Sequence, residues 1–158
     1  MIRRRTMFTF VGVLAAMFAL PSVMASPSKK SFDPDQQVKA LFAEGLQRQQ
    51  EKRYPEAIMV YRRALKLDPN QPETLNNLGF CYKAIKEYKK AVDYYQQALR
   101  LNPKLAEAHE YLGEAYVQLG RMDLAQQEYQ TLLALDPKEA AELKEKIDAS
   151  KIPSAKSQ

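Results

Sequence analysis

The sequence predicts an all-helical protein built from three consecutive helix pairs and one further C-terminal helix. Two observations carry this prediction. Residues of the same type recur at a step of 34 positions, and within each unit the apolar residues recur at helical spacing. The prolines that end each unit mark the period most clearly, at Pro69, Pro103 and Pro137.

Further columns of the sequence keep the same step as the prolines. They include Gly45, Gly79 and Gly113, then Ala57, Ala91 and Ala125, and then Tyr61, Tyr95 and Tyr129. Chance does not align so many columns, so the chain contains true internal repeats. We place the three units at residues 38–71, 72–105 and 106–139.

The first 25 residues have the pattern of a secretory signal. Arginines at positions 3–5 precede an apolar run over residues 7–20, and small residues lead to Ala25. The run has 14 residues, fewer than the ~20 needed to span a hydrocarbon core. We therefore expect cleavage after Ala25 and export to the periplasm. The alternative is an uncleaved segment whose residues 7–20 anchor the chain to the inner membrane.

Residues 26–37 form a polar lead-in that contains the start of the first helix, expected from about Asp35. In each unit a first helix is followed by a short turn and a second helix. In the middle unit, Leu75, Leu78 and Tyr82 lie at helical spacing before that turn. Asn70 and Glu73 have the spacing of a capping box at the start of this unit.

The last predicted helix covers residues 140–150 and caps the open end of the stack. Its apolar residues Ala140, Leu143 and Ile147 share one face, and charged residues occupy the other. Residues 151–158 are expected to be a disordered tail.

The repeated unit resembles the tetratricopeptide repeat. The motif Leu-Gly-x-x-Tyr at residues 78–82 and 112–116, the later Ala and aromatic residue, and the closing Pro match that family over residues 38–139. The first unit departs from the motif at Glu44 and Arg48, as end repeats often do. The resemblance implies a right-handed α-solenoid of three helix pairs, with a concave groove that grips a peptide or a partner's helix.

The resemblance also implies which residues line this groove, on the exposed side of each unit's first helix. The candidate partner-binding residues are Phe42, Leu46, Asn76, Phe80, Lys83, Glu107, Glu110, Glu114 and Val117. Phe42, Leu46 and Phe80 form an apolar end of the groove, and the three glutamates form an acidic end. We hypothesise a partner that places an apolar side chain near Phe80 and a basic one near Glu110 and Glu114.

The simpler alternative is structural. Phe42 and Leu46 would then pack against the lead-in helix, and the glutamates would form a solvated helix face. One subgroup of the family binds the C-terminal carboxylates of chaperones through basic residues. Asn77 matches one of its clamp positions, but Phe42, Glu107 and Tyr111 stand where basic residues are required. Binding of chaperone tails is therefore not expected.

Composition and charge give no sign of catalysis or of nucleic-acid binding. The formal net charge is +5, and three of these charges belong to the segment predicted to be removed. Residues 38–71 and 72–105 each have an excess of three basic side chains, and residues 106–139 have an excess of five acidic ones. The single histidine, His109, and the single cysteine, Cys81, are expected to be packing residues. We therefore expect no cofactor, no metal and no enzyme activity.

The sequence thus favours a protein-binding module, either an adaptor or an assembly scaffold in the bacterial cell envelope. A structural protein that self-associates as a homo-oligomer is the alternative, because solenoid ends and grooves can mate with copies of themselves. A non-catalytic subunit of an envelope enzyme complex is a third interpretation. The expected partner is another protein, with membrane contact only if the signal segment is retained.

Overall fold

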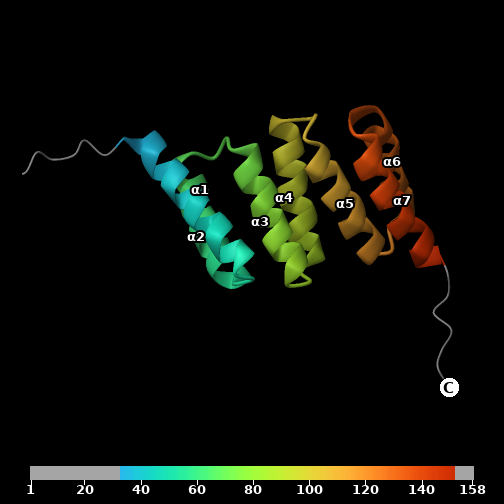
Figure 1. The fold of residues 1–158 in the computed structure, drawn as a ribbon, viewed down its shortest axis with the longest axis horizontal. Coiled ribbons are helices and arrows are strands. Elements are labelled where there is room, and N and C mark those ends of the chain that lie inside the picture. Colours follow the sequence, from blue (N-terminus) through green and yellow to red (C-terminus); the bar gives the residue numbers. More distant parts are fainter. Residues whose placement is uncertain (1–32, 152–158) are drawn as a thin grey trace, which may run out of the picture. The chain divides into compact units, whose positions relative to one another are not determined.

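The computed structural model describes residues 33–151. In this part of the chain seven helices follow one another (Figure 1). They are α1 (Pro34–Gln50), α2 (Tyr54–Leu67), α3 (Pro72–Ala84), α4 (Tyr88–Leu101), α5 (Ala106–Gln118), α6 (Met122–Leu135) and α7 (Pro137–Lys151).

The helices stack in chain order as three antiparallel pairs, α1 with α2, α3 with α4 and α5 with α6. The second helix of each pair packs on the first helix of the following pair, α2 on α3 and α4 on α5. Helix α7 packs on both α5 and α6. The predicted all-α solenoid of three helix pairs plus a C-terminal helix is confirmed. Helix α7 takes the place that the first helix of a fourth pair would occupy.

The core is formed by the repeated small and aromatic residues. Tyr61 and Tyr95 are fully buried, and each ring lies directly against the glycine of its own unit. A Cβ atom on Gly79 would come within 2.7 Å of Tyr95 Cε1, which is closer than real atoms approach. The glycine is therefore required by the ring that fills the space between one pair and the next.

The turn between the two helices of each pair requires a left-handed backbone at its centre. Lys52 has φ 58° in the first pair, Lys86 has φ 65° in the second, and Gly120 has φ 72° in the third. Glycine adopts this conformation without a steric penalty, whereas a residue with a Cβ pays about 1–2 kcal/mol. The first two turns are therefore strained and the third is not.

The predicted capping box at Asn70 and Glu73 is wrong. Helix α3 begins at Pro72, its N-cap is Gln71, and no side chain caps it. The preceding turn is held instead by Asp68, whose carboxylate accepts hydrogen bonds from the backbone N–H of Asn70 (2.9 Å) and from Gln71 Nε2 (2.8 Å). A proline at the first helical position has no N–H to be capped, which removes part of the need for a box.

The predicted signal segment, its possible anchor over residues 7–20 and most of the predicted tail lie outside the described residues. Lys151, the first residue of that tail, belongs to α7. Within residues 33–151, every helix is too short or too polar to cross a bilayer.

Candidate partner-binding groove

Three contacts join α3 to α5 on the side where the groove was predicted. Asn76 Nδ2 donates a hydrogen bond to Glu107 Oε2 at 3.2 Å. The rings of Phe80 and Tyr111 lie 5.4 Å apart between centroids, and Lys83 forms an ion pair with Glu114. Each contact joins residues 31 positions apart, so the three follow one another along the two helices.

The middle of this row is an aromatic cluster around Phe80. Its ring contacts Tyr111 on one side and Tyr54 of α2 on the other, with centroids 6.4 Å apart for the second pair. The ammonium of Lys83 lies 4.1 Å from the Tyr111 ring centroid and 5.4 Å from that of Phe80. This cation–π geometry holds the two rings and the lysine as one unit.

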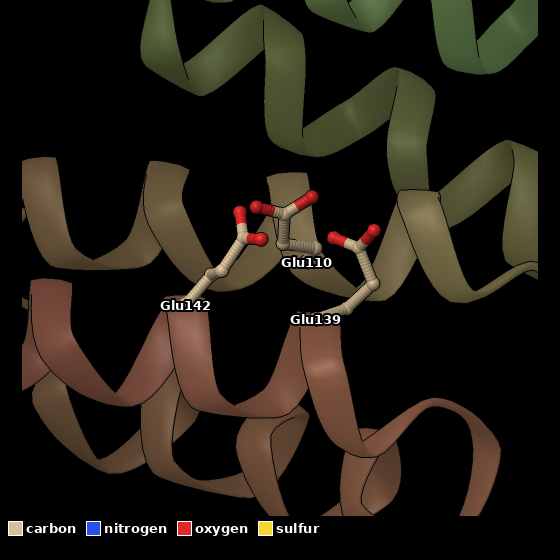
Figure 2. Close-up of side chains that lie close together, drawn as sticks. All are labelled: Glu110, Glu139 and Glu142. Atoms are coloured by element: carbon tan, nitrogen blue, oxygen red, sulfur yellow. The ribbon is translucent and has the colours of Figure 1, made fainter.

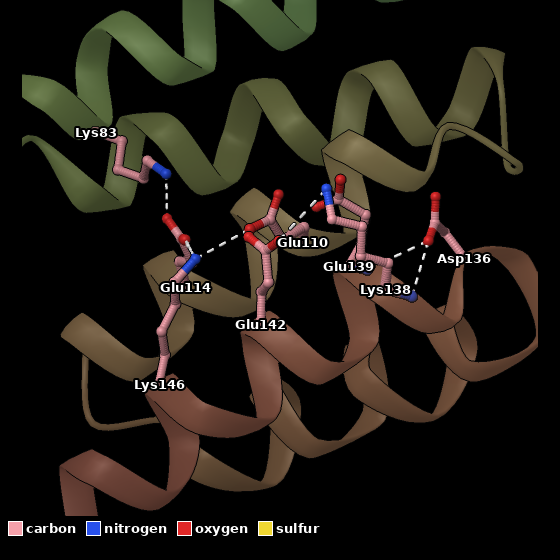
Figure 3. A network of polar contacts seen from close by, with 8 residues as sticks. All are labelled: Lys83, Glu110, Glu114, Asp136, Lys138, Glu139, Glu142 and Lys146. Carbon is pink, nitrogen blue, oxygen red and sulfur yellow. Dashed lines mark hydrogen bonds and ion pairs between the residues drawn. The ribbon is translucent and has the colours of Figure 1, made fainter.

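The acidic end of the row is already paired with a lysine of α7. Lys146 Nζ lies 3.0 Å from Glu110 Oε1 and also forms an ion pair with Glu114, which in turn binds Lys83 (Figure 3). The hypothesis that a partner supplies the basic group at Glu110 and Glu114 therefore needs correction. The chain itself supplies a basic side chain at both carboxylates.

The ionisation of this network follows from burial and from its charge partners. Burial raises the pKa of Glu110 to about 7, and a hydrogen bond with Glu139 adds to the rise while Lys146 opposes it. Burial also acts to raise the pKa of Glu114, but hydrogen bonds from Lys146 and Lys83 outweigh it and the pKa is lowered. The two carboxylates raise the pKa of Lys146 to about 12 against the effect of its burial.

Glu110 also lies close to two carboxylates of α7. Figure 2 shows the side chains of Glu110, Glu139 and Glu142 turned toward one another, and their closest oxygens lie within 4.8 Å of each other. Carboxylate oxygens are suitable ligands for hard cations. Protonation of Glu110, whose pKa burial raises to about 7, and the nearby ammonium of Lys146 both reduce the repulsion among these carboxylates.

Two clefts lie along the first helices of the pairs. One has a volume of about 610 Å³ and is lined by Lys83, Glu114, Val117 and Lys146, among others. The other has a volume of about 220 Å³ and is lined by Phe42 with Lys39, Glu73 and Thr74. Four predicted residues thus line clefts. Phe42 is partly buried, with its ring centroid 6.1 Å from that of Tyr61.

The expectation that all the groove positions are exposed is wrong at two of them. Asn76 is 2% exposed and Glu110 is 5% exposed, because the neighbouring helix of the next pair covers this position of each first helix. Leu46, Phe80 and Val117 are partly buried. The structure therefore does not make one continuous open surface of the nine predicted residues.

His109 and Cys81 have structural surroundings. His109 Nδ1 lies 2.6 Å from Glu128 Oε2, and its Nε2 lies 3.0 Å from the Pro103 carbonyl oxygen. Burial acts to lower its pKa, but these two contacts outweigh burial and raise it. Cys81 is fully buried, and burial raises the pKa of its thiol to about 12, so it is an unreactive packing residue.

Sequence reasoning missed the roles of Lys146 and Tyr111. A signal for both was present, because neighbouring first helices make contacts at steps of 31 or 32 residues and not at the repeat period of 34. From Phe80 this step leads to Tyr111, and from Glu114 it leads to Lys146. Aligned columns show equivalent positions, whereas contacts join positions that are offset by most of a helical turn.

Comparison with protein families identifies the repeat in each unit. Family models described as tetratricopeptide repeat match residues 72–105 and 106–139, and one described as TPR repeat matches residues 45–86. No curated protein matches the chain significantly.

Solved structures with the same fold include several that hold a bound peptide. The first TPR of Spaghetti (RPAP3), bound to the HSP90 peptide SRMEEVD, is 27% identical, with a TM-score of 0.68 over 72% of this chain and 93% of that one. The second TPR domain of human RPAP3, in complex with the HSP70 peptide SGPTIEEVD, is 28% identical, with a TM-score of 0.69 over 73% of this chain and 98% of that one.

A more distant likeness shows the fold alone. PcrH, solved in complex with the chaperone binding region of PopD, is 20% identical, with a TM-score of 0.69 over 77% of this chain and 95% of that one.

Proposed function

The chain is built of tetratricopeptide repeats over residues 45–139, and from this we propose that it is a protein-binding module. Peptide complexes of two structurally similar domains support the proposal. Its role would be that of an adaptor or assembly scaffold without a catalytic step. In residues 33–151 the one histidine contacts Glu128 and the one cysteine is buried.

The observation that carries the proposal is the aromatic row on α3 and α5. Phe80 and Tyr111 are partly buried, and the ammonium of Lys83 lies over both rings. Partly buried aromatic side chains that are held in place are the residues on which protein interfaces most often depend. An apolar side chain of the partner would complete their burial.

The charged part of the partner is expected near Glu107 and Glu142. Both side chains are exposed, although Glu107 accepts a hydrogen bond from Asn76 and Glu142 forms an ion pair with Lys138 at 3.8 Å. Glu110 is buried, and Glu114 already has two lysine partners. A lysine or arginine of the partner near either of these exposed carboxylates would gain electrostatic complementarity without displacing Lys146. Acidic chaperone tails would instead meet like charge at Glu107.

The proposal can be tested by selecting peptides from a random displayed library with the full chain as bait. We expect the selected peptides to combine an aromatic or aliphatic residue with a lysine or arginine. The double variant Phe80→Ala, Glu107→Lys should weaken the binding of such a peptide about 30-fold or more, as loss of an aromatic anchor does. The affinity would be measured by fluorescence anisotropy, with the peptide SRMEEVD as the acidic comparison.

The matched control is Asp93→Lys, which makes the same change of charge at an exposed position of α4 away from the row. Circular dichroism would show that each variant keeps its helices. If the selected peptides bind the double variant as tightly as the natural chain, or if Asp93→Lys weakens them equally, the aromatic row is not the binding site.

We place this module in the bacterial cell envelope, on the strength of the signal-like pattern of residues 1–25. Expression of the full chain in a bacterium, followed by fractionation and N-terminal sequencing, tests the placement. A periplasmic product that begins at Ser26 is expected. An intact N-terminus in the membrane fraction would favour the anchored alternative, and a cytoplasmic product would contradict export.

Self-association is a second candidate, favoured by one side chain at the end of the stack. Leu133 is 44% exposed, whereas Leu65 and Leu99 at the same position of the first two units are partly buried. A second copy that covers Leu133 would give a mass that rises with concentration in light scattering. The variant Leu133→Ser should abolish that rise if this contact is responsible.

A further inference from the structure

The outward side of α2 and α4 carries a group of basic side chains that have no acidic partner. These five residues, which we call the outer face, are Arg62, Arg63, Lys66, Lys89 and Arg100. All are exposed, and none has a carboxylate within 4.0 Å in residues 33–151.

The basic character belongs to these two helices and not to the third helix of the same kind. Helices α2 and α4 each hold three basic side chains and one acidic one. Helix α6, which is equivalent to them, holds two acidic side chains and no basic one. The positive charge is therefore concentrated on two of the three equivalent helices, and such a concentration attracts anionic partners.

The two turns that precede α2 and α4 add a second observation. Lys52 and Lys86 keep a left-handed backbone conformation that costs a non-glycine residue about 1–2 kcal/mol, at the position where the third turn has Gly120. Both lysines are exposed and have no carboxylate within 4.0 Å in the described residues. Each of these two turns therefore carries a positive charge at a position where the backbone favours glycine.

One exposed apolar side chain lies among these cations. Met59 is 61% exposed and stands three, four and seven residues before Arg62, Arg63 and Lys66, so the four share one stripe of α2. Between α2 and α4 a cleft of about 310 Å³ is lined by Arg62, Lys66 and Tyr94, with Leu75 and Leu78 of α3 at its base.

We propose that the outer face docks on an anionic lipid surface. The cations are long, flexible and held by no hydrogen bond to another described residue, so they suit mobile headgroups better than a partner with fixed acidic positions. Met59 can enter the headgroup boundary while the neighbouring cations stay at the phosphates. This surface is on different helices from the aromatic row, so the proposal is independent of peptide binding.

The test is cosedimentation of the full chain with vesicles of phosphatidylcholine alone or with about 30% phosphatidylglycerol, at low and at high salt. Each Lys or Arg near an anionic leaflet contributes about a fivefold factor in partitioning. The variant Arg62→Glu, Arg63→Glu, Lys66→Glu should therefore lose about 100-fold or more in partitioning onto the anionic vesicles at low salt.

A matched control changes the same net charge elsewhere, as Lys39→Glu, Lys104→Glu, Lys138→Glu, all exposed and outside α2 and α4. It should lose less than about tenfold, because charges away from the membrane are screened within a Debye length. Residues 7–20 are the same in every protein, so any contribution of that apolar run cancels. Equal losses in the two variants, no loss in either, or equal binding of the natural chain to neutral and anionic vesicles would overturn the proposal.

A second readout uses the exposure of Met59. The variant Met59→Cys can be labelled selectively with an environment-sensitive fluorophore, because Cys81 is fully buried. Anionic vesicles should shift its emission to shorter wavelength, whereas a label on Gln127→Cys, the equivalent exposed position of α6, should not respond. A shift at both positions or at neither would contradict docking through the outer face.

Discussion

The first two helix pairs differ from the third pair in which side chain packs against the glycine that recurs in each unit. In the first two, the ring of Tyr61 or Tyr95 lies against the glycine of its own unit. In the third, Leu143 of α7 lies against Gly113, and Tyr129 is only partly buried. The same repeat sequence therefore produces two packing arrangements.

The difference arises from the helix that comes next in the chain after each pair. After the first and second pairs a complete repeat begins, and its first helix covers the tyrosine. After the third pair comes α7, which begins at Pro137, three residues before the position at which the repeat period would start it. Leu143 of this helix lies against Gly113, at the place where the first two pairs have a tyrosine. At this end of the solenoid the glycine is thus covered by a side chain of the last helix and not by one of its own unit.

The largest effect expected from this comparison is at the tyrosines. Tyr95→Ala should lower the free energy of unfolding by about 3–5 kcal/mol, because it leaves a large cavity in a fully buried site. Tyr129→Ala should cost only about 1 kcal/mol, since its ring is partly exposed. Urea unfolding followed by circular dichroism measures both.

The control for this pair is Tyr95→Phe, which keeps the ring. The Tyr95 hydroxyl has no hydrogen-bond partner within the described region, whereas the Tyr61 hydroxyl donates to Gln49 Oε1 at 3.0 Å. Tyr95→Phe should therefore be neutral or slightly stabilising. Equal losses for Tyr95→Ala and Tyr129→Ala would show that the two packing arrangements are energetically the same.

The repeat period was sufficient to predict the fold but not the site. Columns of small and aromatic residues report local packing that recurs in each unit, so the helix pairs and the apolar face of α7 could be predicted. The pairing of Lys146 with Glu110 and Glu114 was missed, because these contacts join positions that are offset from the aligned columns. Burial of Asn76 and Glu110 was missed for a related reason, since exposure at a position depends on the neighbouring helix as well as on the helix that carries it.

An effect of intermediate size is expected from pH at the α5–α7 contact. The pKa of Glu110 is raised from 4.5 to about 7. Between these two pH values the folded chain therefore holds a proton that the unfolded chain has released. The stability that this proton gives is complete below about pH 4.5 and is lost as the pH rises through about 7. The variant Glu110→Gln, which keeps a neutral group, should be more stable than the natural chain by about 1–3 kcal/mol at pH 8.

Thermal unfolding of both proteins between pH 4.5 and 8 would measure this difference. The pKa of His109 is also raised, so its contribution to stability also falls as the pH rises. This loss is the same in both proteins and does not affect the comparison. Glu145→Gln, an exposed change on α7, is the control and should leave the pH dependence unaltered. A difference between Glu110→Gln and the natural chain that does not grow with pH would show that Glu110 is ionised throughout.

The smallest expected effect is at the turns, where the comparison can be reversed by exchange of residues. Lys86→Gly should stabilise the second pair by about 0.5–1 kcal/mol, because relief of the left-handed strain exceeds the entropy that glycine adds to the unfolded chain. Gly120→Lys should destabilise the third pair by a similar amount, because the lysine would have to adopt the left-handed backbone of Gly120. No atom lies within 4 Å of the added Cβ, so backbone strain is the main effect. Urea midpoints of the two variants give the measurement. If Lys86→Gly proves destabilising, the lysine makes a favourable contribution that outweighs its backbone strain. If both changes are neutral, the turns differ in sequence but not in energy.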